Sequence, residues 1–106
     1  EVGRVLRPGG VFLAVDNGWW GGDFADLLRD AVGGNANIAP ERTARWWAAR
    51  GAERVQGEGG WAATDAAELE TILRIEFPAA TIDRWIANHP GRSAIHYAFV
   101  VYVWRP

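Results

Sequence analysis

The first seventeen residues constrain the fold most, because a helix stop, a turn and an apolar strand follow one another there. Pro8 disfavours helical geometry at Arg7, and Gly9–Gly10 can adopt the left-handed backbone angles that end a helix, so we expect a helix to close at about Leu6. Val11–Val15 is an unbroken apolar run that predicts a strand buried on both faces. A helix that leads into such a strand is typical of a crossover connection in a parallel α/β sheet.

Two further strands and four helices are expected along the rest of the chain. Val55–Trp61 alternates weakly and contains glycines, which predicts an edge strand with a bulge or bend. Ile95–Trp104 is apolar on both faces from Tyr97 onward, which predicts an interior strand. The pattern of apolar residues places the four helices at about residues 23–32, 40–50, 65–75 and 78–89. Asp23 is expected to cap the first of them, and Asp65, with Glu68 three residues later, the third.

The opening stretch also carries a family resemblance. The sequence R-V-L-R-P-G-G of residues 4–10, followed by a hydrophobic strand ending in Asp16, resembles the segment before and through the fifth strand of class I S-adenosylmethionine-dependent methyltransferases. The order of the elements across essentially the whole chain is similar to the second half of that fold, apart from a longer helical pair at 65–89.

The resemblance implies an α/β fold, namely a partial Rossmann-like methyltransferase fold that forms a single partial domain over residues 1–106. Its three-stranded sheet would be mixed, with the last strand antiparallel and inserted between the first and the second, and with about four helices. The start at Glu1, inside an expected helix, also leads us to expect that the N-terminal cofactor-binding half of the domain lies outside this sequence.

The composition argues against several function classes. A formal net charge of −2, from 11 basic and 13 acidic residues spread along the chain, disfavours nucleic acid and membrane surfaces as partners. The absence of cysteine excludes a disulfide framework, a thiol nucleophile and a thiolate metal site, and agrees with the cytoplasmic location that we expect. The longest apolar run, Tyr97–Trp104, is far shorter than the roughly 20 residues of a membrane-spanning helix.

Polar and aromatic side chains at the end of the first strand form the main candidate site. Asp16 and Asn17 are followed closely by Trp19 and Trp20, and ligands of open α/β sheets bind outside the carboxyl ends of the strands. We therefore expect Asn17, Trp19 and Trp20 to bind substrate and Asp16 to orient it or accept a proton. The alternative is structural: the two polar residues cap a turn and the tryptophans pack on neighbouring helices.

His96 is a second candidate, because it opens an otherwise apolar strand. If that strand runs antiparallel to the first, His96 or Tyr97 would approach the edge that holds Asp16. A histidine can act as a general base at neutral pH, so His96 and Asp16 are the candidate catalytic residues and Tyr97 a candidate substrate-binding residue. The alternative is a hydrogen-bonded structural histidine. The spacing of His89 from His96 matches no metal-ligand pattern, and no metal site is expected.

The resemblance implies that the parent protein transfers a methyl group from S-adenosylmethionine to a small-molecule acceptor. In that family the cofactor is held mainly by loops after the first four strands, which this sequence does not contain. The chain would then supply the substrate-side half, with a small-molecule substrate and the missing half of its own chain as partners, and would be inactive alone.

Two alternatives remain open at this stage. The chain can be half of another Rossmann-like enzyme, such as a nucleotide-dependent oxidoreductase, or a non-catalytic α/β binding module. An antiparallel last strand beside the first favours the methyltransferase over the oxidoreductase. A self-contained binding module predicts a folded monomer without a bare hydrophobic strand edge.

Overall fold

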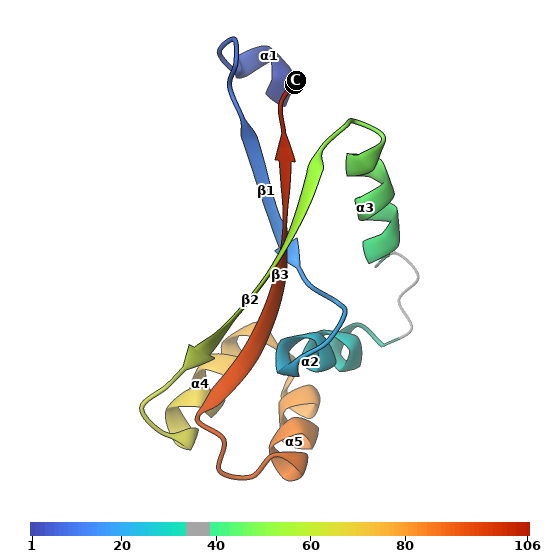
Figure 1. The fold of residues 1–106 in the computed structure, drawn as a ribbon. Coiled ribbons are helices and arrows are strands. Elements are labelled where there is room, and N and C mark those ends of the chain that lie inside the picture. Colours follow the sequence, from blue (N-terminus) through green and yellow to red (C-terminus); the bar gives the residue numbers. More distant parts are fainter. Residues whose placement is uncertain (34–38) are drawn as a thin grey trace.

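The computed structural model describes residues 1–33 and 39–106, which form an α/β fold of five helices and three strands (Figure 1). No helix in these two ranges has both the length and the apolar character needed to cross a membrane. The elements are α1 (Val2–Val5), β1 (Phe12–Asn17), α2 (Asp23–Val32), α3 (Pro40–Ala48), β2 (Glu53–Ala62), α4 (Ala66–Glu76), α5 (Ala79–Asn88) and β3 (Ala94–Trp104).

The predicted helix stop at the start of the chain is confirmed. α1 ends at Val5, and Leu6 follows it in an extended conformation. Gly9 has a φ of 76°, in the left-handed region, and the backbone N–H of Gly10 donates to the carbonyl of Arg7 at 2.8 Å. The turn therefore needs glycine, and it delivers the chain directly into β1.

The sheet has the strand order β1-β3-β2, so the last strand lies between the other two, as predicted. The register pairs Phe12 with Trp104 on one side of β3 and Glu53 with Val103 on the other. The expected mixed sheet is wrong, because both hydrogen-bonded pairs are antiparallel. β1 and β2 do run in the same direction, but β3 separates them.

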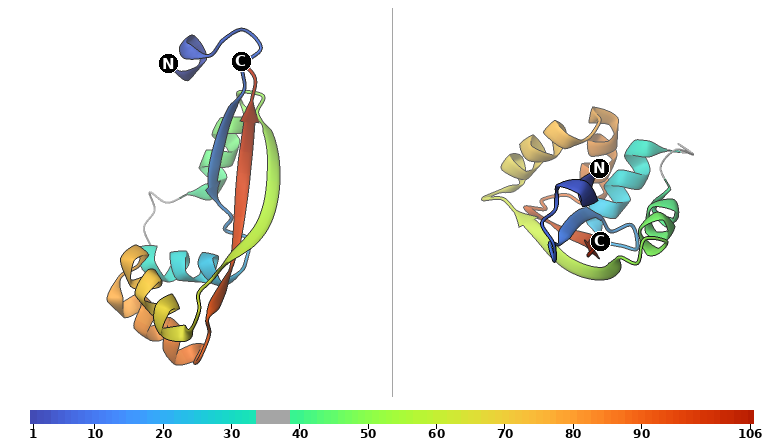
Figure 2. Two further views of the ribbon diagram at one scale, coloured as in Figure 1. Left: turned by 90° about the vertical axis from the view of Figure 1, so that its left-hand side faces the viewer. Right: turned by 90° about the horizontal axis from the view of Figure 1, so that it is seen from above.

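β2 is an edge strand, as predicted, but it contains no bulge. Its register with β3 runs unbroken from Glu53 opposite Val103 to Ala62 opposite Ala94, and the two long strands curve together (Figure 2). Gly57 serves close packing instead. A Cβ on Gly57 would lie 2.4 Å from the ring of Phe99, its partner on β3, so only glycine leaves space for that ring.

The hydrophobic core lies at one end of the sheet, where α2, α4 and α5 gather around the first half of β3 (Figures 1 and 2). The ring of Phe24 on α2 is its centre, since it makes edge-to-face contacts with Trp61, Phe77 and Tyr97 at centroid distances of 5.1, 5.3 and 4.8 Å. The aliphatic members come from the three helices and β3: Leu27, Leu69, Leu73, Ile82 and Ile95.

α3 covers one face of the other end of the sheet. Trp47 stacks on Phe12 of β1 and on Tyr102 of β3, with centroid distances of 5.9 and 5.6 Å. The indole N–H of Trp104 donates to the carbonyl of Arg50 at 3.1 Å, just after the helix. Every second side chain of β1 and β3 points to this face, and α3 covers it there.

The opposite face of this end is open. Leu13 and Val15 on β1 are 59% and 66% exposed, and Val55 lies in the same row, because Val15 pairs with Val101 and Val101 with Val55. The expectation that the first strand is buried on both faces is therefore wrong. β1 is an edge strand, and none of the described helices covers this face of it.

Asp23 does not cap α2 as predicted, because Gly22 occupies the N-cap position and Asp23 begins the helix. Its carboxylate instead accepts hydrogen bonds from the backbone N–H of His96 at 2.8 Å and from Arg92 at 2.7 Å, which joins α2 to the start of β3. Burial raises the pKa of the Asp23 carboxyl, but these hydrogen bonds outweigh it and leave the pKa lowered. The predicted cap of α4 is confirmed, since Asp65 accepts from the N–H of Glu68 at 2.8 Å.

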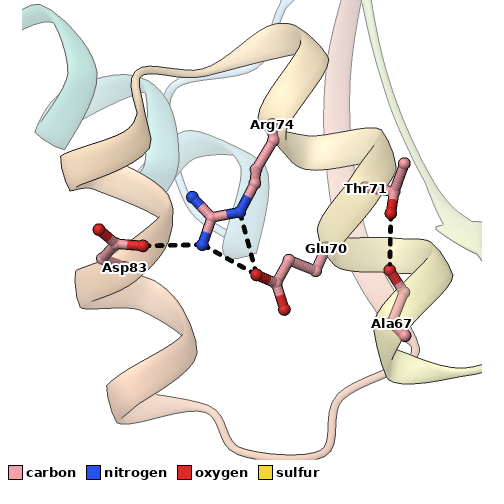
Figure 3. A network of polar contacts seen from close by, with 5 residues as sticks. All are labelled: Ala67, Glu70, Thr71, Arg74 and Asp83. Atoms are coloured by element: carbon pink, nitrogen blue, oxygen red, sulfur yellow. Dashed lines mark hydrogen bonds and ion pairs between the residues drawn. The ribbon is translucent and has the colours of Figure 1, made fainter.

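Charged side chains join the helices on the outside of the core. Arg74 on α4 contacts Glu70 on the same helix at 2.8 Å and Asp83 on α5 at 2.7 Å, as Figure 3 shows. Asp30 on α2 accepts from the hydroxyl of Thr81 at 2.8 Å and from Arg84 at 2.6 Å, both on α5. The Arg84 hydrogen bond, followed by that of Thr81, lowers the pKa of Asp30 from 3.8 to about 2.

Asp30→Asn should lower stability near neutral pH, and the wild-type advantage should shrink as the pH falls from about 4 toward 2. A carboxyl whose pKa is lower in the folded state stabilises the protein above its unfolded pKa and loses that contribution as the pH falls through the folded one. Urea unfolding across this range measures it. Asp26→Asn is the control, because among the described residues Asp26 pairs with Arg29 of its own helix and with no other helix. If the difference in free energy of unfolding between the wild type and Asp30→Asn stays constant down to pH 2, the prediction is wrong.

Val15→Lys should reduce self-association without lowering the free energy of unfolding. The unpaired edge of β1 and its open apolar face favour pairing between chains, and a charge at a 66% exposed position opposes it. Sedimentation velocity measures the association. Ile75→Lys, on α4 and 79% exposed, is the matched control. The prediction fails if both variants have the same effect.

Candidate functional site

A groove with a volume of about 230 Å³ lies on the sheet face that α3 covers, at the carboxyl end of β1. Asp16 and Asn17 contribute from the end of β1, and the following loop adds Trp19 and Trp20. We call this site the β1-end groove. The four residues at the end of the first strand that the sequence indicated as one site do lie together in it.

The base of the groove crosses all three strands. Asp16 pairs with Val100, which pairs with Gln56, and the next row runs from Ala14 through Tyr102 to Arg54. Val100 and the ring of Tyr102 form the middle of the base and make it mostly apolar, and each residue is almost fully covered, at 3% exposed. Neighbouring strands lie about 4.8 Å apart, so the Cα atoms of Asp16 on β1 and Arg54 on β2 are roughly 10–12 Å apart. The two side chains therefore begin on opposite sides of the base of the groove.

Three contacts tie the loop after β1 to β3 and α2. The N–H of Gly18 donates to the carbonyl of Ala98 at 2.8 Å and continues the ladder by one residue. A Cβ on Gly18 would lie 2.6 Å from the ring of Trp20 and 2.8 Å from the backbone carbon of Ala98. The side chain of Arg29 donates to the carbonyl of Trp19. These contacts place the two tryptophans along the groove.

Asp16 lies in a small polar group at one end of the groove. Its Oδ1 accepts the backbone N–H of Asn17 at 2.8 Å, and the Asn17 side-chain oxygen accepts the hydroxyl of Tyr97 at 3.1 Å. Burial, and then the negative charge of Asp16, raise the pKa of the Tyr97 phenol. Asp16 takes part in none of the ion pairs between described residues, so its charge faces the groove unpaired.

The other end of the groove is basic. With its amide oxygen turned toward Arg54, Gln56 accepts two hydrogen bonds from the guanidinium at 3.0 and 3.1 Å. The guanidinium carbon also lies 5.8 Å from the ring centroid of Trp20. Arg54 is therefore neutralised by no carboxylate in these contacts and keeps a positive charge beside the groove.

His96 lies outside the groove. His96 precedes Phe99 on β3, and Phe99 forms the last β1–β3 pair, with Asn17. At His96, β3 is therefore paired with β2 alone among the described strands. The His96 ring packs so closely on Gly22 that a Cβ there would lie 2.2 Å from Nδ1, and its Nε2 is 3.7 Å from the Glu58 carboxylate. Of the two neighbouring residues, only Tyr97 reaches the Asp16 end, through Asn17.

Sequence reasoning missed the contributions of β2, β3 and α3. Gln56 lines the groove because the register brings it level with Asp16, and Tyr102 and Arg54 line it from the next row, level with Ala14. The start of α3 adds Pro40, Glu41 and Ala44. Alternation along β2 does place Arg54 and Gln56 on one face. The register of β1, β3 and β2 cannot be read from the sequence, because it depends on how three segments far apart in the chain pair.

The groove does not fit S-adenosylmethionine. Its volume of about 230 Å³ is below the roughly 300–1,000 Å³ of sites for drug-sized ligands. The strand–glycine loop–helix junction at 18–22 does not offer a phosphate site either, because Asp23 and Asp26 place two acids in the first turn of α2. Among the described residues, no three His, Asp or Glu side chains form a group that could hold a metal ion.

Comparisons of the chain with protein-family models, curated proteins and solved structures found no match. The geometry of the β1-end groove and the topology around it therefore indicate what the chain can bind. A carboxylate, an apolar base, two tryptophans and a guanidinium can bind and orient one small polar molecule.

Gly18→Ala should lower the free energy of unfolding by about 1–3 kcal/mol, because the new methyl group collides with the Trp20 ring and with the backbone of β3. Gly21→Ala, in the same loop, should change it by less than about 0.5 kcal/mol, since its Cβ meets open space. Denaturant unfolding of both variants tests this. Equal losses would show that Gly18 does not hold the loop as described.

Proposed function

We propose that the chain is the substrate-side half of an S-adenosylmethionine-dependent methyltransferase and that the β1-end groove belongs to its substrate site. The observation that carries this proposal is the strand order β1-β3-β2, with β3 antiparallel to both neighbours. It is the arrangement that the resemblance of residues 4–16 implies for the end of that fold. The helix stop and the Gly9 turn ahead of β1 support it further.

Two observations weigh against the alternatives. A nucleotide-dependent oxidoreductase does not call for an antiparallel last strand between the other two, which is the feature that separates the two enzyme classes here. A self-contained binding module predicts no bare hydrophobic edge, whereas β1 leaves Leu13 and Val15 exposed beside an unpaired edge. An open face of this kind favours a chain that is completed by further structure.

Within this proposal the groove binds and positions the methyl acceptor. Asp16 accepts a hydrogen bond or proton from it, and Trp19 and Trp20 hold its apolar part. Tyr97 is a positioning residue, because it acts through Asn17. His96 is not placed to reach a ligand in the groove, so we assign it no role in proton transfer. Holding the acceptor in one geometry is the main catalytic contribution of these residues.

The sequence encoded upstream of Glu1 tests the proposal directly. We expect a strand followed by an acidic residue and Gly-x-Gly-x-Gly on the order of 100 residues earlier, as domain sizes allow. A complete upstream sequence without that pattern would overturn the proposal.

The 106-residue chain alone should show no binding of S-adenosylmethionine in calorimetric titration up to about 1 mM, because its groove does not fit the cofactor. The protein extended by its upstream sequence should bind it and transfer its methyl group. Micromolar binding by the 106-residue chain, or none by the extended protein, would contradict the assignment of the two halves.

A further inference from the structure

We propose that the β1-end groove binds a small molecule made of an aromatic ring and a protonated amine, with the ammonium group at Asp16 and the ring over Val100 and Tyr102. This inference rests on the proposed function, since it names the substrate class of the same site. It follows from how charge and apolar surface are distributed along the groove.

The ammonium group is matched to Asp16. Oδ1 of this carboxylate is engaged by the N–H of Asn17, and Oδ2 accepts no hydrogen bond from a described residue. The side chain is half-buried, so water weakens a charged hydrogen bond there less than at the surface. Tyr97 cannot neutralise Asp16, because its hydroxyl donates to Asn17 instead. Oδ2 of Asp16 can therefore accept a hydrogen bond from a ligand.

The ring is matched to the middle of the groove. Val100 and Tyr102 form an apolar base, and Trp47 fixes Tyr102 by stacking on it from α3. Trp20 is 42% exposed along the side of the groove, and the part of its ring that the Arg54 guanidinium leaves uncovered can contact a ligand ring. The volume of about 230 Å³ suits one ring with a short side chain.

The charges at the rim select an amine over an acid. Glu41 at the start of α3 adds a second carboxylate to the lining, so two acids face one guanidinium. Arg54 already donates to Gln56 and is exposed, which makes it the weaker charge partner. It can still donate to an uncharged acceptor, such as a phenol oxygen, at the far end of the ring.

Three probes that share one ring test the inference on the unmodified chain. Tyramine carries the ammonium group, para-ethylphenol lacks it, and phloretate has a carboxylate in its place. In NMR titrations that follow the amide signals of Asp16, Asn17 and Gly18, tyramine should bind about tenfold or more tightly than para-ethylphenol, as a charge-assisted hydrogen bond implies. Phloretate should bind most weakly.

Variants assign the effect to named residues. Asp16→Asn should lower the affinity for tyramine to that for para-ethylphenol and leave the affinity for para-ethylphenol unchanged. Trp20→Ala should lower both affinities. Trp46→Ala is the matched control, because Trp46 is similarly exposed, at 49%, and lies on α3 outside the groove lining. If Asp16→Asn does not fold, the three-probe comparison still decides the question.

Equal affinity for the three probes, or signal shifts away from the groove, would overturn the inference. The titrations contain no cofactor, so they are independent of the proposed function. Tyramine binding together with an extended protein that binds no S-adenosylmethionine would overturn the methyltransferase proposal alone. Methyl transfer to an acceptor without an amine, with no preference for tyramine in the groove, would overturn this inference alone.

Discussion

The antiparallel pairing of β3 with both of its neighbours is the constraint on which the rest of the structure depends. Successive side chains of a strand point to opposite faces, so β3 serves two purposes at once. Ile95 and Tyr97 enter the core that α2, α4 and α5 build, while Val100 and Tyr102 form the base of the groove under α3. Loss of the pairing would remove the core and the groove together.

The two ends of the sheet are organised differently. One end is a closed core, joined to β3 by the hydrogen bonds of Asp23 with Arg92 and the His96 backbone. The other end has α3 on one face and the open row of Leu13, Val15 and Val55 on the other. The groove lies at this less complete end, which agrees with the proposal that further structure completes the site.

Local signals predicted much of this fold. The Gly9 turn and the Asp65 cap depend on neighbours within a few residues, and the insertion of β3 was expected from the resemblance and agrees with its two apolar faces. Exposure of β1 could not be read from its apolar run, since burial depends on what covers it. Asp23 takes its role from the backbone of His96 on β3, and Arg54 reaches the groove through the register of β2 with β3, neither of which a local pattern specifies.

The whole arrangement requires β3 to run antiparallel between β1 and β2. Antiparallel pairing brings opposed Cα atoms to about 4.5 Å at alternate positions, so Hα–Hα nuclear Overhauser contacts identify it directly. We predict such contacts along β3 to both neighbours, in the row of Val15–Val101 on the β1 side and in the row of Val100–Gln56 on the β2 side, and none between β1 and β2. Contacts between β1 and β2, or a β3 that pairs with only one of them, would contradict it.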